Sequence, residues 1–177
     1  TEFKNVSIIP SSINLAGAEI ELVDLKNRES KLKTALSLVK NDFDFIFLDC
    51  PPSLGLITLN ALCCTDTFFV PIQCEYYALE GVSLLTSNIR RIKSTLNPKI
   101  DIDGVLLTML DARTNLGLQV IEEVKKYFQD KVYKTVVPRN VRLSEAPSHG
   151  ESIIQYDPKS RGAEVYLELA REVIKNG

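Results

Sequence analysis

Short apolar runs alternate along the chain with longer segments in which apolar residues recur every three or four positions. The short runs, which predict strands, are 6–9, 43–48, 67–72, 102–110 and 135–137. The periodic segments, which predict helices, are 15–25, 32–39, 82–96, 120–128 and 163–174. Apolar strands that alternate with amphipathic helices are typical of a parallel sheet covered by helices on both faces. The pattern therefore predicts an α/β fold, with residues 1–177 forming a single domain.

Three of the predicted helices carry apolar stripes, which are expected to face the core and to have no chemical role. Besides the two described next, the helix 82–96 has a stripe made of Val82, Leu85, Ile89, Ile92 and Leu96. The first stripe consists of Val120, Ile121, Val124, Tyr127 and Phe128. The second consists of Ala163, Tyr166, Leu167, Ala170, Val173 and Ile174.

Composition excludes several classes of function. The net charge of −2 means that the molecule is not a polycation, so contact with nucleic acid requires a local basic patch. No apolar run approaches the ~20 residues of a membrane span, which favours a cytoplasmic protein without a membrane partner. The cysteines, Cys50, Cys63, Cys64 and Cys74, and the single histidine have no zinc-site spacing, so we expect reduced and mostly buried thiols.

Polar residues follow each predicted strand. Asp49 comes directly after the run 43–48, Glu75 follows 67–72, Asp111 follows 102–110, and Arg139 follows 135–137. Parallel strands end at the same edge of a sheet, and ligands bind beyond that edge. The sequence therefore predicts a polar binding rim at the carboxyl ends of the strands.

Asp49 is the clearest candidate on this rim. An acid at the end of a hydrophobic strand is typical of the magnesium side of P-loop phosphate-transferring proteins, and a carboxylate suits a hard, hydrated cation. Ser53 is the better candidate to cap the helix that follows. The partner motif of such a site, G-x-x-x-x-G-K-[ST], is absent, because none of the eight glycines is followed by lysine.

Five segments resemble the ParA-type partitioning ATPases, specifically their chromosomal Soj branch. The segments are 49–55 (DCPPSLG), 73–81 (QCEYYALEG), 106–114 (LLTMLDART), 137–147 (VPRNVRLSEAP) and 156–163, which begins with YDP and ends with SRGA. The resemblance extends along the whole chain. It implies a P-loop NTPase-like, mostly parallel sheet with helices on both faces, here without the first strand, loop and helix.

The resemblance also implies function. Members of this family form dimers that depend on ATP and Mg²⁺, bind double-stranded DNA nonspecifically, and are stimulated by a ParB-type centromere-binding protein. We therefore expect a cytoplasmic, nucleoid-associated ATP hydrolase without a membrane partner. We expect the phosphate loop and the switch I acids to precede Thr1, which leaves the 177-residue chain unable to bind or hydrolyse ATP by itself.

Particular residues match the functional positions of the family. Asp49 matches the Walker B acid, on the magnesium side and acting through water. Arg113 and Arg142 match arginines that contact DNA phosphates. The residues expected on the adenine side are Thr108, Met109, Pro138, Arg139 and Asn140.

Two alternatives remain open from the sequence. The chain could be an interaction module that binds DNA, a ParB-type protein or its own copies without nucleotide. Arg113 and Arg142 could form surface ion pairs, which contribute only about 0–1 kcal/mol, instead of contacting DNA. In the family the missing first strand lies in the middle of the sheet, so its loss is expected to leave open strand edges, which can pair with another chain.

Overall fold

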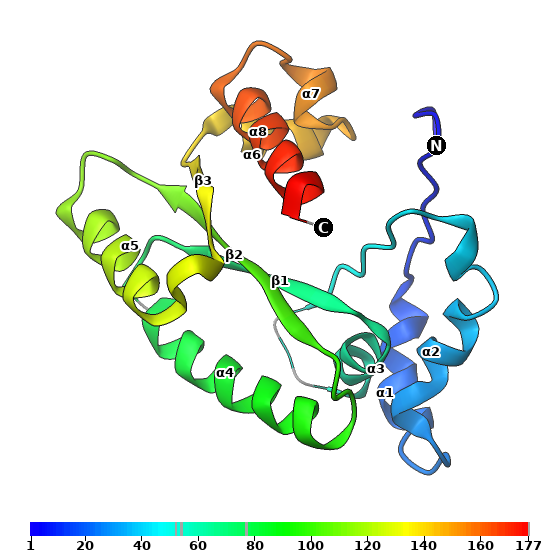
Figure 1. Cartoon of the computed structure of the whole chain (residues 1–177). Helices are drawn as coiled ribbons and strands as arrows, with labels where there is room; N and C mark the ends of the chain where they lie inside the picture. Colours follow the sequence, from blue (N-terminus) through cyan, green and yellow to red (C-terminus); the bar gives the residue numbers. More distant parts are fainter. Residues whose placement is uncertain (52, 54, 77, 177) are drawn as a thin grey trace. The chain divides into compact units, whose positions relative to one another are not determined.

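The computed structural model describes residues 1–51, 53, 55–76 and 78–176, and the chain divides into two compact units (Figure 1). The first unit comprises Thr1–Asp66 and Ile92–Ile100, and the second comprises Thr67–Arg91 and Asp101–Gly177. All strands in the described part of the chain belong to the second unit. That residues 1–177 form a single domain stays a prediction.

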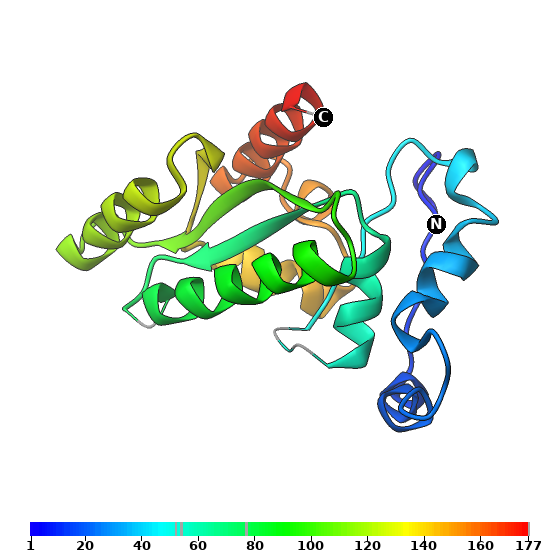
Figure 2. The ribbon, with the colours of Figure 1, turned by 60° about the horizontal axis from the view of Figure 1, so that its bottom comes forward.

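The second unit is built on a parallel three-stranded sheet, in the order β1 (Thr67–Gln73), β2 (Asp101–Leu110) and β3 (Val132–Pro138). Helix α4 (Ala78–Thr95) leads from β1 to β2, and α5 (Asn115–Phe128) leads from β2 to β3 (Figures 1 and 2). The predicted alternation of strands and helices is confirmed here, and the third strand begins at Val132 rather than Thr135.

The core of this unit lies between the sheet and α5. Val105 and Leu107 of β2 are completely buried, and they pack with Val120 and Val124 of α5. The predicted stripe on α5 is therefore confirmed, except that Tyr127 is 51% exposed. The near-continuous apolar sequence of β2 reflects this burial, because a strand covered by a helix needs apolar side chains on that face.

Helix α8 (Arg161–Asn176) lies on the other side of β3 from α5 (Figures 1 and 2). The predicted buried stripe on this helix is partly wrong, because Ile174 is 65% exposed and both Tyr166 and Leu167 are exposed. Ala163 is completely buried and Val173 is partly buried, as predicted, and the inward side also includes Gly162, Val165, Leu169 and Glu172. A prediction based on the spacing of apolar residues cannot detect inward positions occupied by a glycine and a glutamate.

Three short elements connect β3 to α8. They are α6 (Val141–Glu145), a 3₁₀ turn (Ala146–His149) and α7 (Ile153–Tyr156). A capping box opens α7, because the Ser152 hydroxyl accepts from the Gln155 N–H while the Gln155 side chain accepts from the Ser152 N–H. These elements bring the polar side chains that follow β3 into a defined arrangement.

The first unit is helical where the sequence predicts a mixture of helices and strands. Its elements are 3₁₀ turns at Ile13–Gly17, Arg28–Ser30 and Lys40–Asp42, with helices α1 (Ala18–Glu21), α2 (Lys31–Leu36) and α3 (Leu56–Cys64). The strands predicted at 6–9 and 43–48 are not formed, and their side chains are exposed, as with Ile9 at 89% and Phe47 at 66%. The physical reason is that a strand acquires its hydrogen bonds from a neighbouring strand, and neither run has one among the described residues.

Buried amides hold the first unit together. Asn60 on α3 accepts a hydrogen bond from the Leu32 N–H (3.1 Å) and donates to the Arg28 carbonyl (2.8 Å). Asn97 donates to the Thr65 carbonyl at 2.8 Å. Each amide satisfies backbone groups that the short helices leave unpaired, so the polar contacts compensate for a small apolar core.

Glu19, rather than Ser53, caps α3. The Glu19 carboxylate accepts from the Leu56 N–H (2.9 Å) and the Ile57 N–H (3.2 Å), and Gly55 occupies the capping position. The expectation for Ser53 is wrong because the helix begins at Leu56, beyond the reach of a serine that precedes the cap by two positions. Gly55 leaves room for the carboxylate, since a Cβ there would lie 2.3 Å from Oε1 of Glu19.

Candidate functional site

The carboxyl ends of the three strands form a continuous polar rim. The Cys74 N–H, just beyond β1, donates to the Thr108 carbonyl on β2 at 2.8 Å. The Arg139 N–H, just beyond β3, donates to the Leu110 carbonyl at 2.9 Å. The register pairs Leu110 with Pro138 at the same level. The structure therefore brings together the five residues expected on the adenine side, which are Thr108, Met109, Pro138, Arg139 and Asn140.

An ion pair crosses this rim from the end of β1 to the end of β3. The Arg139 guanidinium donates to Glu75 Oε1 at 2.6 Å, and both side chains are about half exposed. An exposed pair of this kind contributes only about 0–1 kcal/mol to stability. What matters here is that it connects the end of β1 with the end of β3. The sequence places both residues on the rim but carries no signal that they pair, because they are 64 positions apart.

Met109 has a left-handed backbone conformation, with a φ of 57°. A residue with a Cβ pays roughly 1–2 kcal/mol for this conformation, and such outliers gather at functional sites. The flanking backbone bonds to Thr108 and Leu110 hold the distortion in place. Sequence reasoning selects Met109 only by resemblance, because methionine has no preference for this conformation.

Asn140 has a structural role in addition to any contact with ligand. Its side-chain oxygen accepts from the Arg142 N–H at 2.8 Å and so caps α6. An amide at this position satisfies one of the unpaired donors of the first turn. The contact fixes the direction in which α6 leaves the rim.

Asp49 lies in the first unit, in the irregular segment that precedes α3, and it is exposed. Its role as the magnesium-side acid stays a prediction. Pro52 and Leu54, which belong to the segment resembling Walker B and switch II, lie outside the described residues. In the part of the chain that the structure describes, around Asp49 included, no three His, Cys, Asp or Glu side chains gather in a way that could hold a metal ion.

Arg113 folds back onto the acid two positions before it. Its Nε and Nη2 donate to the two Asp111 carboxylate oxygens at 2.9 and 2.7 Å, and its backbone N–H donates at 3.1 Å. These bonds hold the pKa of Asp111 well below its usual range. The Arg113 side chain is still 86% exposed, so it is accessible to a ligand that can replace the carboxylate.

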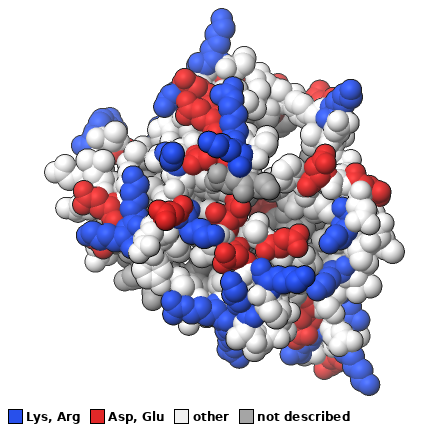
Figure 3. Space-filling model, viewed as in Figure 1, with Lys and Arg blue, Asp and Glu red and all other residues white. Residues whose placement is uncertain are grey.

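Arg142 is paired as well. Its guanidinium lies 2.9 Å from Glu145 and 3.5 Å from Asp157. Acidic and basic side chains are interspersed over the face of the molecule in Figure 3. On this face, positive residues do not form a large patch of one sign, so their acidic neighbours reduce the local attraction for an anion.

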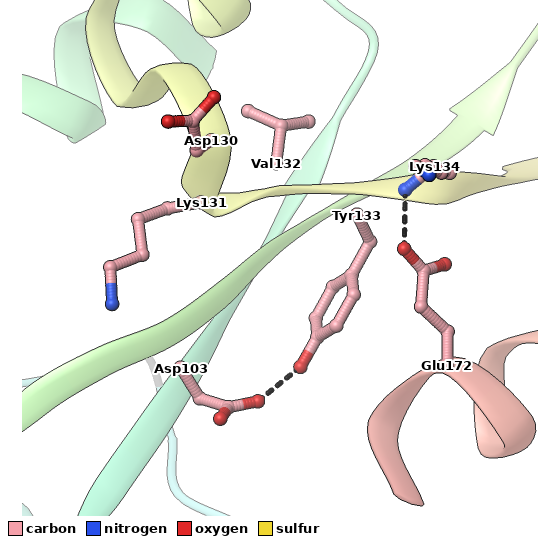
Figure 4. Close-up of a pocket in the computed structure, with 7 residues that line it drawn as sticks. All are labelled: Asp103, Asp130, Lys131, Val132, Tyr133, Lys134 and Glu172. Carbon is pink, nitrogen blue, oxygen red and sulfur yellow. Dashed lines mark hydrogen bonds between the residues drawn. The ribbon is translucent and has the colours of Figure 1, made fainter. Parts of the chain in front are cut away.

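A second polar depression lies at the opposite, amino ends of β2 and β3 (Figure 4). It has a volume of about 160 Å³ and is lined by Asp103, Asp130, Lys131, Val132, Tyr133, Lys134 and Glu172. Its polar groups bind one another, since the Tyr133 hydroxyl donates to Asp103 and Glu172 accepts from the Lys134 N–H. We assign these contacts to the fold.

The cysteines are all free. Cys63 and Cys74 are buried, Cys64 is partly buried and Cys50 is exposed, which agrees with the expectation of mostly buried thiols. Burial raises the pKa of the Cys64 thiol to about 11, so this thiol is protonated at neutral pH and a poor nucleophile. Among the helices of the described chain, none combines the length and apolar character needed to cross a bilayer.

Comparison with known proteins extends these observations. A family model described as "AAA domain" matches residues 1–102. The chain is 66% identical to the sporulation initiation inhibitor protein Soj of Bacillus subtilis, over the whole chain and 70% of that protein. It is 53% identical to the chromosome partitioning protein ParA of Myxococcus xanthus, over 99% of the chain and 62% of the relative. It is 51% identical to the chromosome-partitioning ATPase Soj of Treponema pallidum, over 98% of this chain and 69% of that protein.

Solved structures agree on the fold. Cobyrinic acid a,c-diamide synthase from Mycobacterium smegmatis, with bound ADP and magnesium, superimposes with a TM-score of 0.76 and 35% identity, over 92% of this chain and 59% of that one. The apo McdA structure from Cyanthece gives a TM-score of 0.78 at 17% identity, which supports the fold alone. The chain thus spans between 59% and 70% of the lengths of the proteins named here.

Proposed function

The chain belongs to the Soj/ParA family of chromosome-partitioning ATPases, and we propose that the whole protein uses ATP and Mg²⁺ to segregate DNA. The observation that carries the nucleotide part is the rim at the ends of β1, β2 and β3, where five residues matching the adenine side of the family meet. The M. smegmatis structure with ADP and magnesium, at 35% identity, supports the same choice of cofactor.

Within this proposal the rim binds the base. Adenine contacts Thr108, Met109 and residues 138–140, where backbone groups at the ends of β2 and β3 read its edge. Mg²⁺ bound with ATP would neutralise phosphate charge, and Asp49 is the residue that would hold it, through water. The single ion pair of Arg139 with Glu75 joins the ends of β3 and β1 on this rim.

The DNA part of the proposal concerns Arg113 and Arg142. Both side chains are exposed by more than half, and both belong to segments that resemble the family. Guanidinium groups bind phosphate oxygens without reading bases, so binding to double-stranded DNA is nonspecific. We further propose an ATP-dependent homodimer, stimulation by a ParB-type protein, and a cytoplasmic, nucleoid-associated location.

Replacing either arginine is expected to weaken DNA binding without preventing ATP-dependent dimerisation of the whole protein. Each of Arg113→Ala and Arg142→Ala removes one phosphate contact, which reduces the slope of log affinity against log salt by about 0.9. Binding to a random-sequence duplex over a salt series measures this, with Arg161→Ala as the matched control. Identical curves for the variants and the unsubstituted protein contradict the proposal.

The alternative function is a nucleotide-independent interaction module. It is favoured by the lack of any glycine followed by lysine among the 177 residues. We expect calorimetric titration of the 177-residue chain with Mg·ATP to give no binding heat, because the clustered N–H groups and lysine of a phosphate loop are missing. A dissociation constant in the micromolar range contradicts this expectation. DNA binding by the chain that does not change on addition of Mg·ATP supports the module.

A further inference from the structure

Two carboxylates from different elements enclose the Arg142 guanidinium. Glu145, on α6, accepts from Nη1 at 2.9 Å. Asp157, directly after α7, lies 3.5 Å from Nε. These two acids, called the acidic clamp below, occupy the two sides of the guanidinium that form bidentate contacts with phosphate.

The clamp is anchored by α7. The Tyr156 hydroxyl donates to Glu145 Oε2 at 3.2 Å, so this carboxylate oxygen is held by two donors. The Tyr156 ring stacks on His149, with centroids 4.9 Å apart and an angle of 25°. Glu145 is therefore fixed by the 3₁₀ turn and α7 as well as by its own helix, which distinguishes it from an isolated surface acid.

The acidic clamp makes the surroundings of Arg142 repulsive to an approaching anion. One guanidinium faces two carboxylates, so the cluster carries a net charge of about −1 when all three groups are ionised. A DNA phosphate that approaches Arg142 must displace both acids or tolerate their repulsion. By comparison, Arg161 forms an ion pair of the same helical spacing with Glu164, at 2.6 Å.

We propose that Glu145 and Asp157 compete with DNA phosphate for Arg142, and so keep the affinity of this arginine for DNA low until the clamp opens. The inference rests on the proposed contact of Arg142 with DNA and adds two positioning residues to it. Because both acids act through Arg142, their effect on DNA binding disappears when Arg142 is absent.

The test compares isosteric variants of the whole protein in the presence of Mg·ATP. Asp157→Asn and Glu145→Gln each remove one negative charge and keep the side-chain shape. We expect each to tighten binding to a labelled random-sequence duplex about 3-fold at low salt, and the double variant about 10-fold. Fluorescence anisotropy over a series of salt concentrations measures the change.

Two controls separate the clamp from a general effect of charge. Glu164→Gln removes one negative charge from the Arg161 pair, and we expect it to tighten binding by less than about 1.5-fold. In an Arg142→Ala background, Asp157→Asn is expected to change affinity no more than Glu164→Gln does. Thermal unfolding of each variant identifies a loss of fold, and Asp157→Asn alone decides the outcome if Glu145→Gln disturbs α6.

The possible failures are distinguishable. Equal DNA binding with and without Arg142, or no binding of the unsubstituted whole protein with Mg·ATP at low salt, overturns the proposed DNA contact and the clamp together. Weaker binding by Arg142→Ala, combined with acid variants that bind no more tightly than Glu164→Gln, overturns the clamp and leaves the proposed contact standing. If Asp157→Asn also tightens DNA binding in the Arg142→Ala background, the clamp is likewise overturned and the proposed DNA contact still stands.

Discussion

Gly104→Val is expected to lower the free energy of unfolding of the chain by about 3 kcal/mol or more, because the strand has no space for a side chain there. Gly104 is buried in β2, and a Cβ at this position would lie 2.3 Å from Cε2 and 2.5 Å from Cζ of Tyr133. Contacts below about 3 Å require the ring or the strand to move.

The Tyr133 ring cannot move away easily. It is 3% exposed, its hydroxyl donates to Asp103, and its edge packs against the Phe69 ring with centroids 6.3 Å apart. Displacing it breaks a buried hydrogen bond and an aromatic contact at the same time. The cost of the valine therefore includes these interactions as well as the overlap.

Urea unfolding followed by circular dichroism measures the effect. Gly81→Ala, in α4, is the matched control, because nothing lies within 4 Å of a Cβ at that position. Alanine there is expected to be neutral or to stabilise by up to about 1 kcal/mol. A second variant that combines Gly104→Val with Tyr133→Ala is expected to be less than additive. An unchanged urea midpoint for Gly104→Val contradicts the close packing.

The strand predictions are correct for runs that have a neighbouring strand to pair with, and wrong for runs that lack one. The runs 67–72 and 102–110 are apolar, and they become β1 and β2 because they pair with each other and α5 covers them. The run 43–48 is equally apolar, but it has no neighbouring strand in the structure and remains irregular. Hydrophobic pattern reports the tendency to be buried, whereas strand formation also requires a partner for the backbone.

Some features of the candidate site could be predicted from the sequence and others could not. The rim could be predicted because parallel strands must end at one edge, which places Thr108 and Arg139 together without further information. The pairing of Arg139 with Glu75 and the acidic clamp around Arg142 could not be predicted. The pair joins residues 64 positions apart, and the clamp depends on how α6 and α7 are placed relative to each other, which no local residue pattern encodes.

Glu172→Ala is expected to lower the free energy of unfolding by about 2–3 kcal/mol at neutral pH, because one carboxylate satisfies three donors of β3. Glu172 accepts from the Lys134 N–H (2.8 Å), the Thr135 N–H (3.0 Å) and the Thr135 hydroxyl (2.8 Å). Figure 4 shows the carboxylate reaching from α8 to the strand. β3 lies at the edge of the sheet, so the carboxylate replaces the partner that an inner strand has.

The stabilisation by Glu172 is expected to depend on pH. Burial acts to raise the pKa of this carboxyl, but the hydrogen bonds from Lys134 and Thr135 outweigh burial, and the net result is a lowered pKa. A lowered pKa in the folded state gives stability that is complete above the unfolded value of about 4.3. This stability is lost as the pH falls through the folded value, when the carboxylate is protonated.

The difference in unfolding free energy between the unsubstituted chain and Glu172→Ala should therefore be constant near neutral pH and shrink below about pH 4. Glu168→Ala, one turn earlier on the exposed side of α8, is the control and should change stability by less than about 0.5 kcal/mol. Glu172→Gln keeps a neutral acceptor, so its smaller deficit isolates the contribution of the charge. A deficit for Glu172→Ala that stays constant through acid pH would mean that packing by the side chain, and not its carboxylate, joins α8 to β3.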